Sequence, residues 1–171
     1  MASTYTLISS QVLGSSAATV TFSSIPSTYK DLVLRCSTRD DAAGTSYYQL
    51  YSQFNNDTAG NYSVTALRGD GSAAISLRST GSFQNFLGYD DTSVATTNTF
   101  ASAEMYLPNY TTTSSVKPFA SFSAHENNVS TPVYIFAGAN LWNSTAAITT
   151  WKIFPGSGNF VTGSSFYLYG I

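Results

Sequence analysis

The sequence predicts an all-β protein, folded as a single jelly-roll-like antiparallel β-sandwich of about ten strands over residues 1–171. Three observations carry this prediction. Residues that favour pleated strands are abundant, with 22 Thr, 12 Tyr and 11 Phe in the chain. Residues that favour helices, such as Lys, Glu and Gln, are scarce. Short segments of alternating apolar residues recur about every 10 to 16 residues between turn residues, which is typical of sandwiches and barrels.

The individual strands follow from this alternation. In the segment 31–39, for example, Leu32, Leu34 and Cys36 share one face, as in a strand with one side buried. The segment 62–67 fits either a short strand or one helical turn. Polar loops and prolines separate the segments, because proline cannot continue a central ladder. The expected strands are 4–10, 18–22, 31–39, 46–54, 82–89, 100–107, 119–126, 133–141, 148–154 and a terminal strand within 159–171.

The last segment is rich in aromatic residues and runs as a strand to the final residue. Chain ends usually fray unless they are held. We therefore expect this strand to be paired inside a sheet or buried at a contact between subunits. The residues expected at such an assembly contact are Phe166, Tyr167, Leu168, Tyr169 and Ile171.

The composition argues against several classes of protein. Only 9% of the residues are charged, against about 25% in typical domains, and Ser and Thr together make up 49 of 171 residues. A net charge of −2 without a basic stripe argues against nucleic-acid binding. No apolar run approaches the roughly 20 residues of a membrane helix. The absence of a signal-peptide pattern and the single Cys36 predict synthesis in a cytoplasm, without an intramolecular disulfide.

The sequence offers no constellation of catalytic or metal-binding residues. His125 and Glu126 are neighbours on an expected strand, so they point to opposite faces and cannot easily act as a pair. We expect His125 to be a surface or half-buried residue. The carboxylate pairs at 40–41 and 90–91 fall in expected loops, where Asp serves ordinary turn chemistry. The sequence therefore predicts no enzymatic activity, no metal and no cofactor.

Aromatic and amide side chains offer one candidate ligand site. Trp142 lies in a segment that resembles a loop tip, where a flat ring could stack on a sugar. Trp151 alternates with Ile153, which favours a position partly in the core. The candidate glycan contacts are Trp142, Asn140, Asn143, Tyr47 and Tyr51.

A series of short segments in a characteristic order resembles a family of small virion structural proteins of tailed bacteriophages, common among phages of aquatic bacteria. The resemblance covers nearly the whole chain, and it depends on the order and spacing of the segments more than on any one of them. The segments are YTLISSQVL (5–13), VTFSSIP (20–26), YKDLVL (29–34) followed by Arg39, FNND (54–57), NYS (61–63), NF (159–160), GS (163–164) and LYGI (168–171).

This resemblance implies a non-enzymatic β-sandwich carried on the virion, as a capsid decoration or as a small tail or fibre appendage. The implied partners are further copies of the chain, expected as a homotrimer, and capsid or tail subunits. A phage protein is made in the host cytoplasm and released by lysis, which agrees with the single Cys and the lack of a signal-peptide pattern. The alternative from another class is a carbohydrate-binding module that recognises a glycan on the host surface.

Overall fold

The computed structural model describes residues 4–128 and 132–171, which form twelve β-strands and no helix. Accordingly, none of these described residues forms a helix that could span a membrane. The strands are β1 (Thr6–Val12), β2 (Val20–Phe22), β3 (Leu32–Thr38), β4 (Tyr47–Phe54), β5 (Tyr62–Gly69), β6 (Ala74–Ser82), β7 (Asn85–Asp91), β8 (Ala101–Leu107), β9 (Lys117–His125), β10 (Tyr134–Trp142), β11 (Trp151–Pro155) and β12 (Ser165–Gly170).

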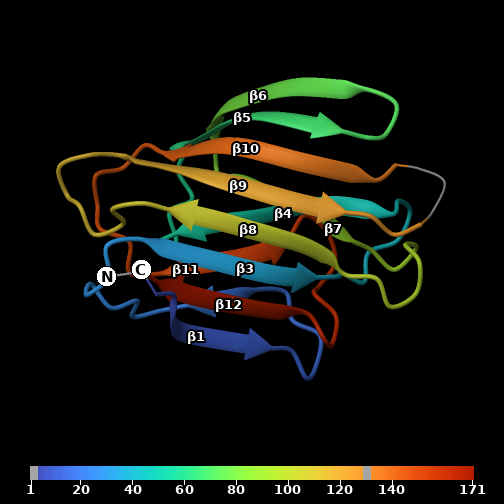
Figure 1. The fold of residues 1–171 in the computed structure, drawn as a ribbon, viewed down its shortest axis with the longest axis horizontal. Coiled ribbons are helices and arrows are strands. Elements are labelled where there is room, and N and C mark those ends of the chain that lie inside the picture. The colour runs from blue at the N-terminus through green and yellow to red at the C-terminus, as the bar shows by residue number, and fades with distance from the viewer. Residues whose placement is uncertain (1–3, 129–131) are drawn as a thin grey trace.

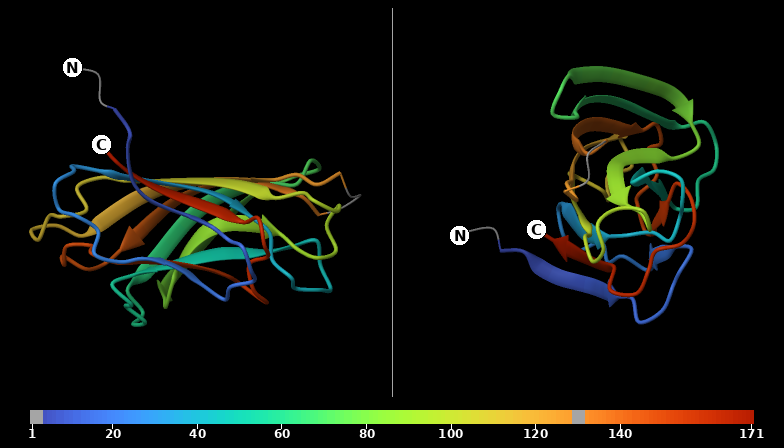
Figure 2. Two further views of the ribbon diagram at one scale, coloured as in Figure 1. Left: turned by 90° about the horizontal axis from the view of Figure 1, so that it is seen from below. Right: turned by 90° about the vertical axis from the view of Figure 1, so that its right-hand side faces the viewer.

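The strands form two sheets that pack in layers (Figures 1 and 2). The large sheet has eight strands in the order β1-β12-β3-β8-β9-β10-β5-β6, and the small sheet has four in the order β2-β11-β4-β7. Every pair of neighbouring strands is antiparallel. The prediction of an all-β antiparallel sandwich is confirmed, with twelve strands in place of about ten.

Eight of the strands pair in a nested order. β1 pairs with β12 and β3 with β8 in the large sheet, while β2 pairs with β11 and β4 with β7 in the small sheet. This nesting is compatible with a jelly roll, which arranges eight strands in two sheets. The other four strands are two hairpins inserted into this order. β5–β6 follows β4, β9–β10 follows β8, and both extend the large sheet beyond β8.

Two strands differ from the expectation. The segment 62–67 lies within β5, so the choice between a strand and a helical turn is settled in favour of the strand. β6 was not expected at all. Its alternation is short: Ile75 and Leu77 alternate with Ser76 and Arg78, but the strand continues as Ser, Thr and Gly, and most of its residues are exposed.

The main core lies between the two sheets and contains a cluster of aromatic rings. The ring of Phe54 contacts those of Trp151, Phe119 and Trp142, with centroids 5.1, 5.5 and 5.6 Å apart. Trp151 is fully buried, which confirms the core position that its alternation with Ile153 predicts. A second apolar cluster lies where β7 packs against β9, β10 and β5; its buried members are Val64, Ala66, Tyr89, Tyr134 and Phe136.

The terminal strand β12 is paired on both sides, with β1 and with β3. This confirms the expectation that it lies inside a sheet. The prediction of an assembly contact is wrong for Phe166 and Leu168, because both side chains are fully buried in the core of the chain itself. Tyr167 and Tyr169 alternate with them and are half-buried. Ile171 lies beyond the strand, where its backbone N–H donates to the Asp31 carbonyl at 3.0 Å.

Candidate functional site

The predicted position of Trp142 is wrong. Trp142 is the last residue of β10 rather than a loop tip, and only 2% of its surface is exposed. Its indole Nε1 donates a hydrogen bond to Asp57 Oδ2 at 2.7 Å. The ring packs against Phe54, so it has no free face on which a sugar could stack. The structure therefore assigns Trp142 to the core.

The other predicted glycan contacts do not form one surface. Asn140 is buried, and its amide donates to Ser121 Oγ at 2.9 Å. Asn143 is exposed just beyond β10. Tyr47 is half-buried in an aromatic cluster, where its ring centroid lies 4.8 Å from that of Tyr134. Tyr51 is the member of this set that lines an open pocket.

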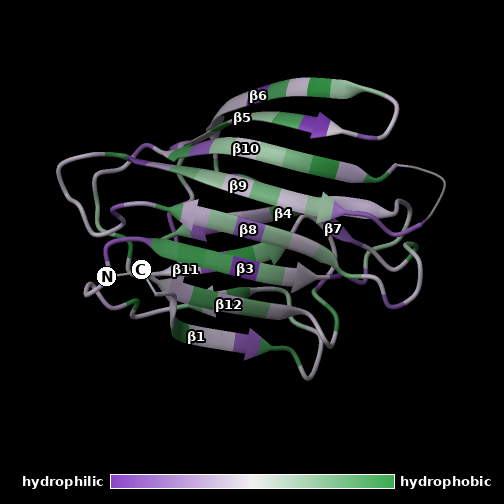
Figure 3. Cartoon of the chain, viewed as in Figure 1, coloured by the Kyte–Doolittle hydropathy of each residue, from purple (hydrophilic) through white to green (hydrophobic). Residues whose placement is uncertain are grey.

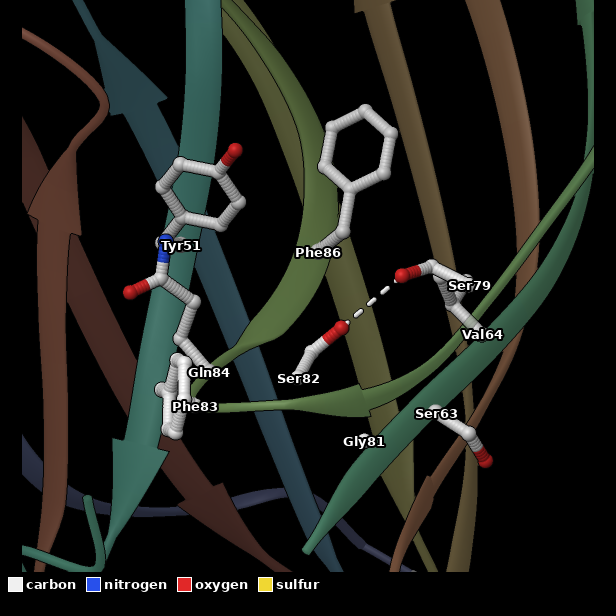
Figure 4. A pocket seen from close by; sticks show the side chains of 9 residues that line it. All are labelled: Tyr51, Ser63, Val64, Ser79, Gly81, Ser82, Phe83, Gln84 and Phe86. Atoms are coloured by element: carbon white, nitrogen blue, oxygen red, sulfur yellow. Dashed lines mark hydrogen bonds between the residues drawn. The ribbon is translucent and has the colours of Figure 1, made fainter. Parts of the chain in front are cut away.

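That pocket lies between the inserted β5–β6 hairpin and the strands β4 and β7 (Figure 4). Its volume is about 440 Å³, which is within the usual range for small-molecule sites. The lining residues come from four places: β4, the β5–β6 hairpin, the turn that leads into β7, and β7 itself. The lining residues are Tyr51, Ser63, Val64, Ser79, Gly81, Ser82, Phe83, Gln84 and Phe86.

A short turn between β6 and β7 places an aromatic ring at the pocket. Gly81, near the end of β6, has a φ of 66°, a conformation that favours glycine. Phe83 follows, with 64% of its surface exposed. Its backbone carbonyl accepts a hydrogen bond of 2.9 Å from the side-chain amide of the buried Gln53. This bond ties the backbone of the turn to the small sheet.

The polar groups at the pocket are hydroxyls and an amide. The Ser79 and Ser82 hydroxyls are bonded to each other at 2.9 Å, as the dashed line in Figure 4 shows. Tyr51 lies near Phe86, with the ring centroids 5.9 Å apart, and burial raises the pKa of its phenol. Among the described residues that line this pocket, none is Asp, Glu, Lys, Arg or His. The site is therefore uncharged at neutral pH.

A second polar cluster lies deep inside the sandwich. His125, expected near the surface, is buried, and its Nε2 lies 3.0 Å from Asp91 Oδ1. Asn127 donates to the same carboxylate oxygen at 2.9 Å. The prediction of a loop that begins at Asp90 is also wrong for its first two residues. Asp90 and Asp91 form the buried end of β7. With no exposure to solvent, these groups are not placed to meet a substrate.

A carboxyl pair adjoins this cluster. Asp40 and Asp90 are both fully buried, and Asp90 has no hydrogen-bonding cation among the described residues. Burial and the neighbouring Asp40 carboxyl raise the pKa of Asp90 well above its ordinary value. Burial also raises the pKa of Asp40 to about 6, although a hydrogen bond from the Ala42 backbone opposes the shift. Within residues 4–128 and 132–171, no group of three or more His, Cys, Asp or Glu is arranged to hold a metal ion.

The outer face of the large sheet is the third feature that a partner could meet. Strongly hydrophilic positions are few along its strands (Figure 3). Arg35 and Glu104 neutralise each other across β3 and β8, with Nε and Oε2 2.6 Å apart. The same row continues through Phe122 on β9, the register partner of Glu104, to Ala137 of β10 and Leu67 on β5, and both larger side chains are exposed. This face is therefore apolar near its centre and weakly charged.

The fold and these surfaces define a weakly charged β-sandwich with two inserted hairpins, an open uncharged pocket beside one of them and a weakly polar outer sheet. Comparison of the chain with models of known protein families, and with curated protein sequences, finds no match. The phage-virion resemblance of the sequence thus stands as a prediction.

The residues that shape the pocket were missed because they lie around β6. The segment 82–89 was expected as one strand beginning at Ser82, whereas β7 begins at Asn85 and leaves Phe83 and Gln84 in the turn. One signal was available. The run Gly81-Ser82 before Phe83 is typical of a turn, and an aromatic residue in a turn has no partner strand to cover it.

Proposed function

We propose that this chain is a non-enzymatic structural protein of a tailed-phage virion. It decorates or braces the capsid, or forms a small tail or fibre appendage, through protein–protein contacts. Its partners are other copies of itself, as a homotrimer, and capsid or tail subunits. The order of sequence segments described above supports the virion assignment. The observation in the structure that supports assembly is that both edge strands of the large sheet are long and mostly exposed.

Both edge strands of this sheet are long and have little protection. β1 has seven residues and β6 has nine, and most of them are exposed. Proteins usually protect an edge with charge, proline or a bulge, because its unpaired N–H and C=O groups can pair with another chain. β1 contains no charged residue and no proline, and Arg78 is the single charge in β6. Each edge pairing has one bulge, between Leu7 and Ser9 in β1 and between Tyr62 and Val64 where β5 pairs with β6, and the rest of each register is regular.

The strand directions favour a contact between unlike edges. Seven successive antiparallel pairings connect β1 to β6, so these two edge strands run in opposite directions. If β6 of one copy lies beside β1 of the next, the new pair is antiparallel and the outer faces stay aligned. Such a head-to-tail contact forms a ring when the rotation closes, and a trimer is one such ring.

Light scattering on the full chain tests the assembly. We expect a trimer, against a monomer mass of 18.3 kDa. Leu7→Lys on β1 and Ile75→Lys on β6 place a cation on an exposed edge and should each reduce the mass to that of the monomer. Phe122→Lys is the matched control, since this side chain is exposed in the middle of the same sheet. A wild-type monomer, or a trimer that survives both edge changes, would contradict the edge contact.

The virion assignment has a separate test. Antibodies against the purified chain are applied to intact particles of the phage that encodes it and are imaged with gold labels. Labelling at the head supports decoration, and labelling at the tail supports an appendage. Particles without label, and without the chain in their protein content, would refute the virion assignment even if the chain forms trimers.

A further inference from the structure

The pocket of Figure 4 is an addition to the eight nested strands. It exists because the β5–β6 hairpin, inserted between β4 and β7, continues the large sheet past the small one. β6 supplies part of the wall, although both its faces are exposed and it adds little to the main core. Functional sites are often carried by such additions to a stable scaffold.

The polar groups around the pocket fit a neutral ligand with many hydroxyls. Three serines and Tyr51 contribute hydroxyls, and Gln84 contributes an amide. Each hydroxyl can donate one hydrogen bond and accept two, so Ser79 and Ser82 keep bonding capacity beyond the bond between them. Because the lining side chains carry no formal charge, a charged ligand would lose its hydration without meeting a counter-ion.

The aromatic groups add a flat apolar surface beside these hydroxyls. Figure 4 shows the rings of Tyr51 and Phe86 at one end of the pocket, and Phe83 stands beside Gln84 on the same turn. A fully buried Phe stabilises a protein by about 1.5–3 kcal/mol relative to an exposed one. Phe83 lacks most of this stabilisation, because 64% of its surface is exposed. Its backbone carbonyl is nevertheless hydrogen-bonded to Gln53, so the turn that carries the ring is anchored to β4.

From these observations we propose that the pocket binds a neutral oligosaccharide. The apolar C–H face of one sugar ring packs on Phe83, while the serine hydroxyls, Tyr51 and Gln84 bond to the sugar hydroxyls. This site is distinct from the residues Trp142 and Asn140, which are buried. The inference does not depend on assembly, since the edge contact of β6 uses its free backbone and the pocket uses its side chains.

Binding is tested by titrating the ¹⁵N-labelled chain with lactose, maltose and cellobiose, with glucuronate as a charged comparison. We expect one or more of the neutral disaccharides to shift the amide signals of residues 79–86, and glucuronate to leave them unchanged. If none of the three disaccharides shifts these signals, or if glucuronate binds as well as they do, the inference is wrong.

Variants locate the site. Phe83→Ala should weaken the binding at least about tenfold, equivalent to roughly 1.4 kcal/mol. Gln84→Leu should weaken it while keeping the aromatic surface. Phe122→Ala is the matched control, because Phe122 is also an exposed phenylalanine but lies on the outer sheet face. All three positions are accessible, and an unchanged melting temperature verifies folding. Equal affinity in Phe83→Ala and wild type, or an equal loss in Phe122→Ala, would overturn the assignment.

Discussion

Trp142 Nε1 donates a hydrogen bond to Asp57 Oδ2 at 2.7 Å, joining the end of β10 to the loop that follows β4. Asn61 Nδ2 donates to the same oxygen at 2.9 Å, and the Ala59 backbone N–H donates to Oδ1 at 2.8 Å. Burial alone would raise the pKa of Asp57, but these hydrogen bonds together hold it below its usual value. The Asp57 carboxylate thus fixes the loop between β4 and β5, which leads into the inserted hairpin, through three hydrogen bonds.

Removing this indole donor should destabilise the protein. Trp142→Phe leaves Asp57 with one donor fewer and should lower the free energy of unfolding by about 1–3 kcal/mol, measured by chemical denaturation. Trp151→Phe is the matched control, because the Nε1 of the equally buried Trp151 has no hydrogen-bond partner among the described residues. A larger loss for Trp151→Phe would show that ring volume, rather than the hydrogen bond, governs both positions.

The same bond predicts a pH effect. A carboxylate whose pKa is lowered by folding stabilises the native state above its unfolded pKa of about 3.9, and that contribution is lost as the pH falls through the folded pKa. In Trp142→Phe the pKa of Asp57 should therefore rise toward its ordinary value. ¹³C NMR titration of the carboxyl carbon measures this directly. An unchanged pKa would mean that Asn61 and Ala59 alone set it.

The buried carboxyl pair predicts the opposite trend at higher pH. Folding raises the pKa of Asp40 to about 6 and that of Asp90 well above its ordinary value, mainly because both are buried. Such groups contribute stability below about pH 4 that is lost as the pH rises through the folded pKa. The free energy of unfolding should therefore fall between pH 4 and 7. Asp90→Asn should flatten this decline and raise stability at pH 7, whereas Glu104→Gln, an exposed acid, should leave the decline in place.

Lys117 should be essential to the folded state despite its charge. It is buried, its ammonium donates to the carbonyls of Thr112, Ser115 and Thr145 at 2.8, 2.9 and 3.2 Å, and burial lowers its pKa. Lys117→Met leaves those carbonyls without their donor and should reduce the free energy of unfolding by about 2–4 kcal/mol. Lys30→Met, at an exposed lysine, should change it little. Equal effects in calorimetry would contradict a structural role for the Lys117 ammonium.

Gly88 should tolerate no side chain. Its φ is 139°, and a Cβ atom there would lie 2.0 Å from Ser123 Oγ and 2.5 Å from Ser123 Cβ. The Ser123 hydroxyl also accepts a hydrogen bond from the Tyr89 backbone at 3.1 Å, so it cannot retreat without losing that contact. Gly88→Ala should destabilise the chain by more than about 3 kcal/mol. Gly14→Ala, where nothing lies within 4 Å, is the control, and a soluble Gly88→Ala protein with wild-type melting would refute this reasoning.

The sequence by itself determined that the chain is all-β and where most of its strands lie. Alternation is a local property, so Leu32, Leu34 and Cys36 could be assigned to one buried face without knowing what covers it. Strand composition and the terminal segment likewise identified the paired strand β12. The signal for β6 was weak, because only Ile75 and Leu77 alternate with polar residues and the rest of this mostly exposed strand is Ser, Thr and Gly.

Only the tertiary structure decided which strands are neighbours and which polar residues are buried. Pairing is non-local, and an alternating segment can pair with any other of similar length. Trp142 and Asp90 were expected in loops because the residues around them resemble loop residues. Both are buried, because elements distant in the sequence cover them. The pocket likewise arises from β4, β7 and the inserted hairpin together, and no single segment contains enough of it to be recognised.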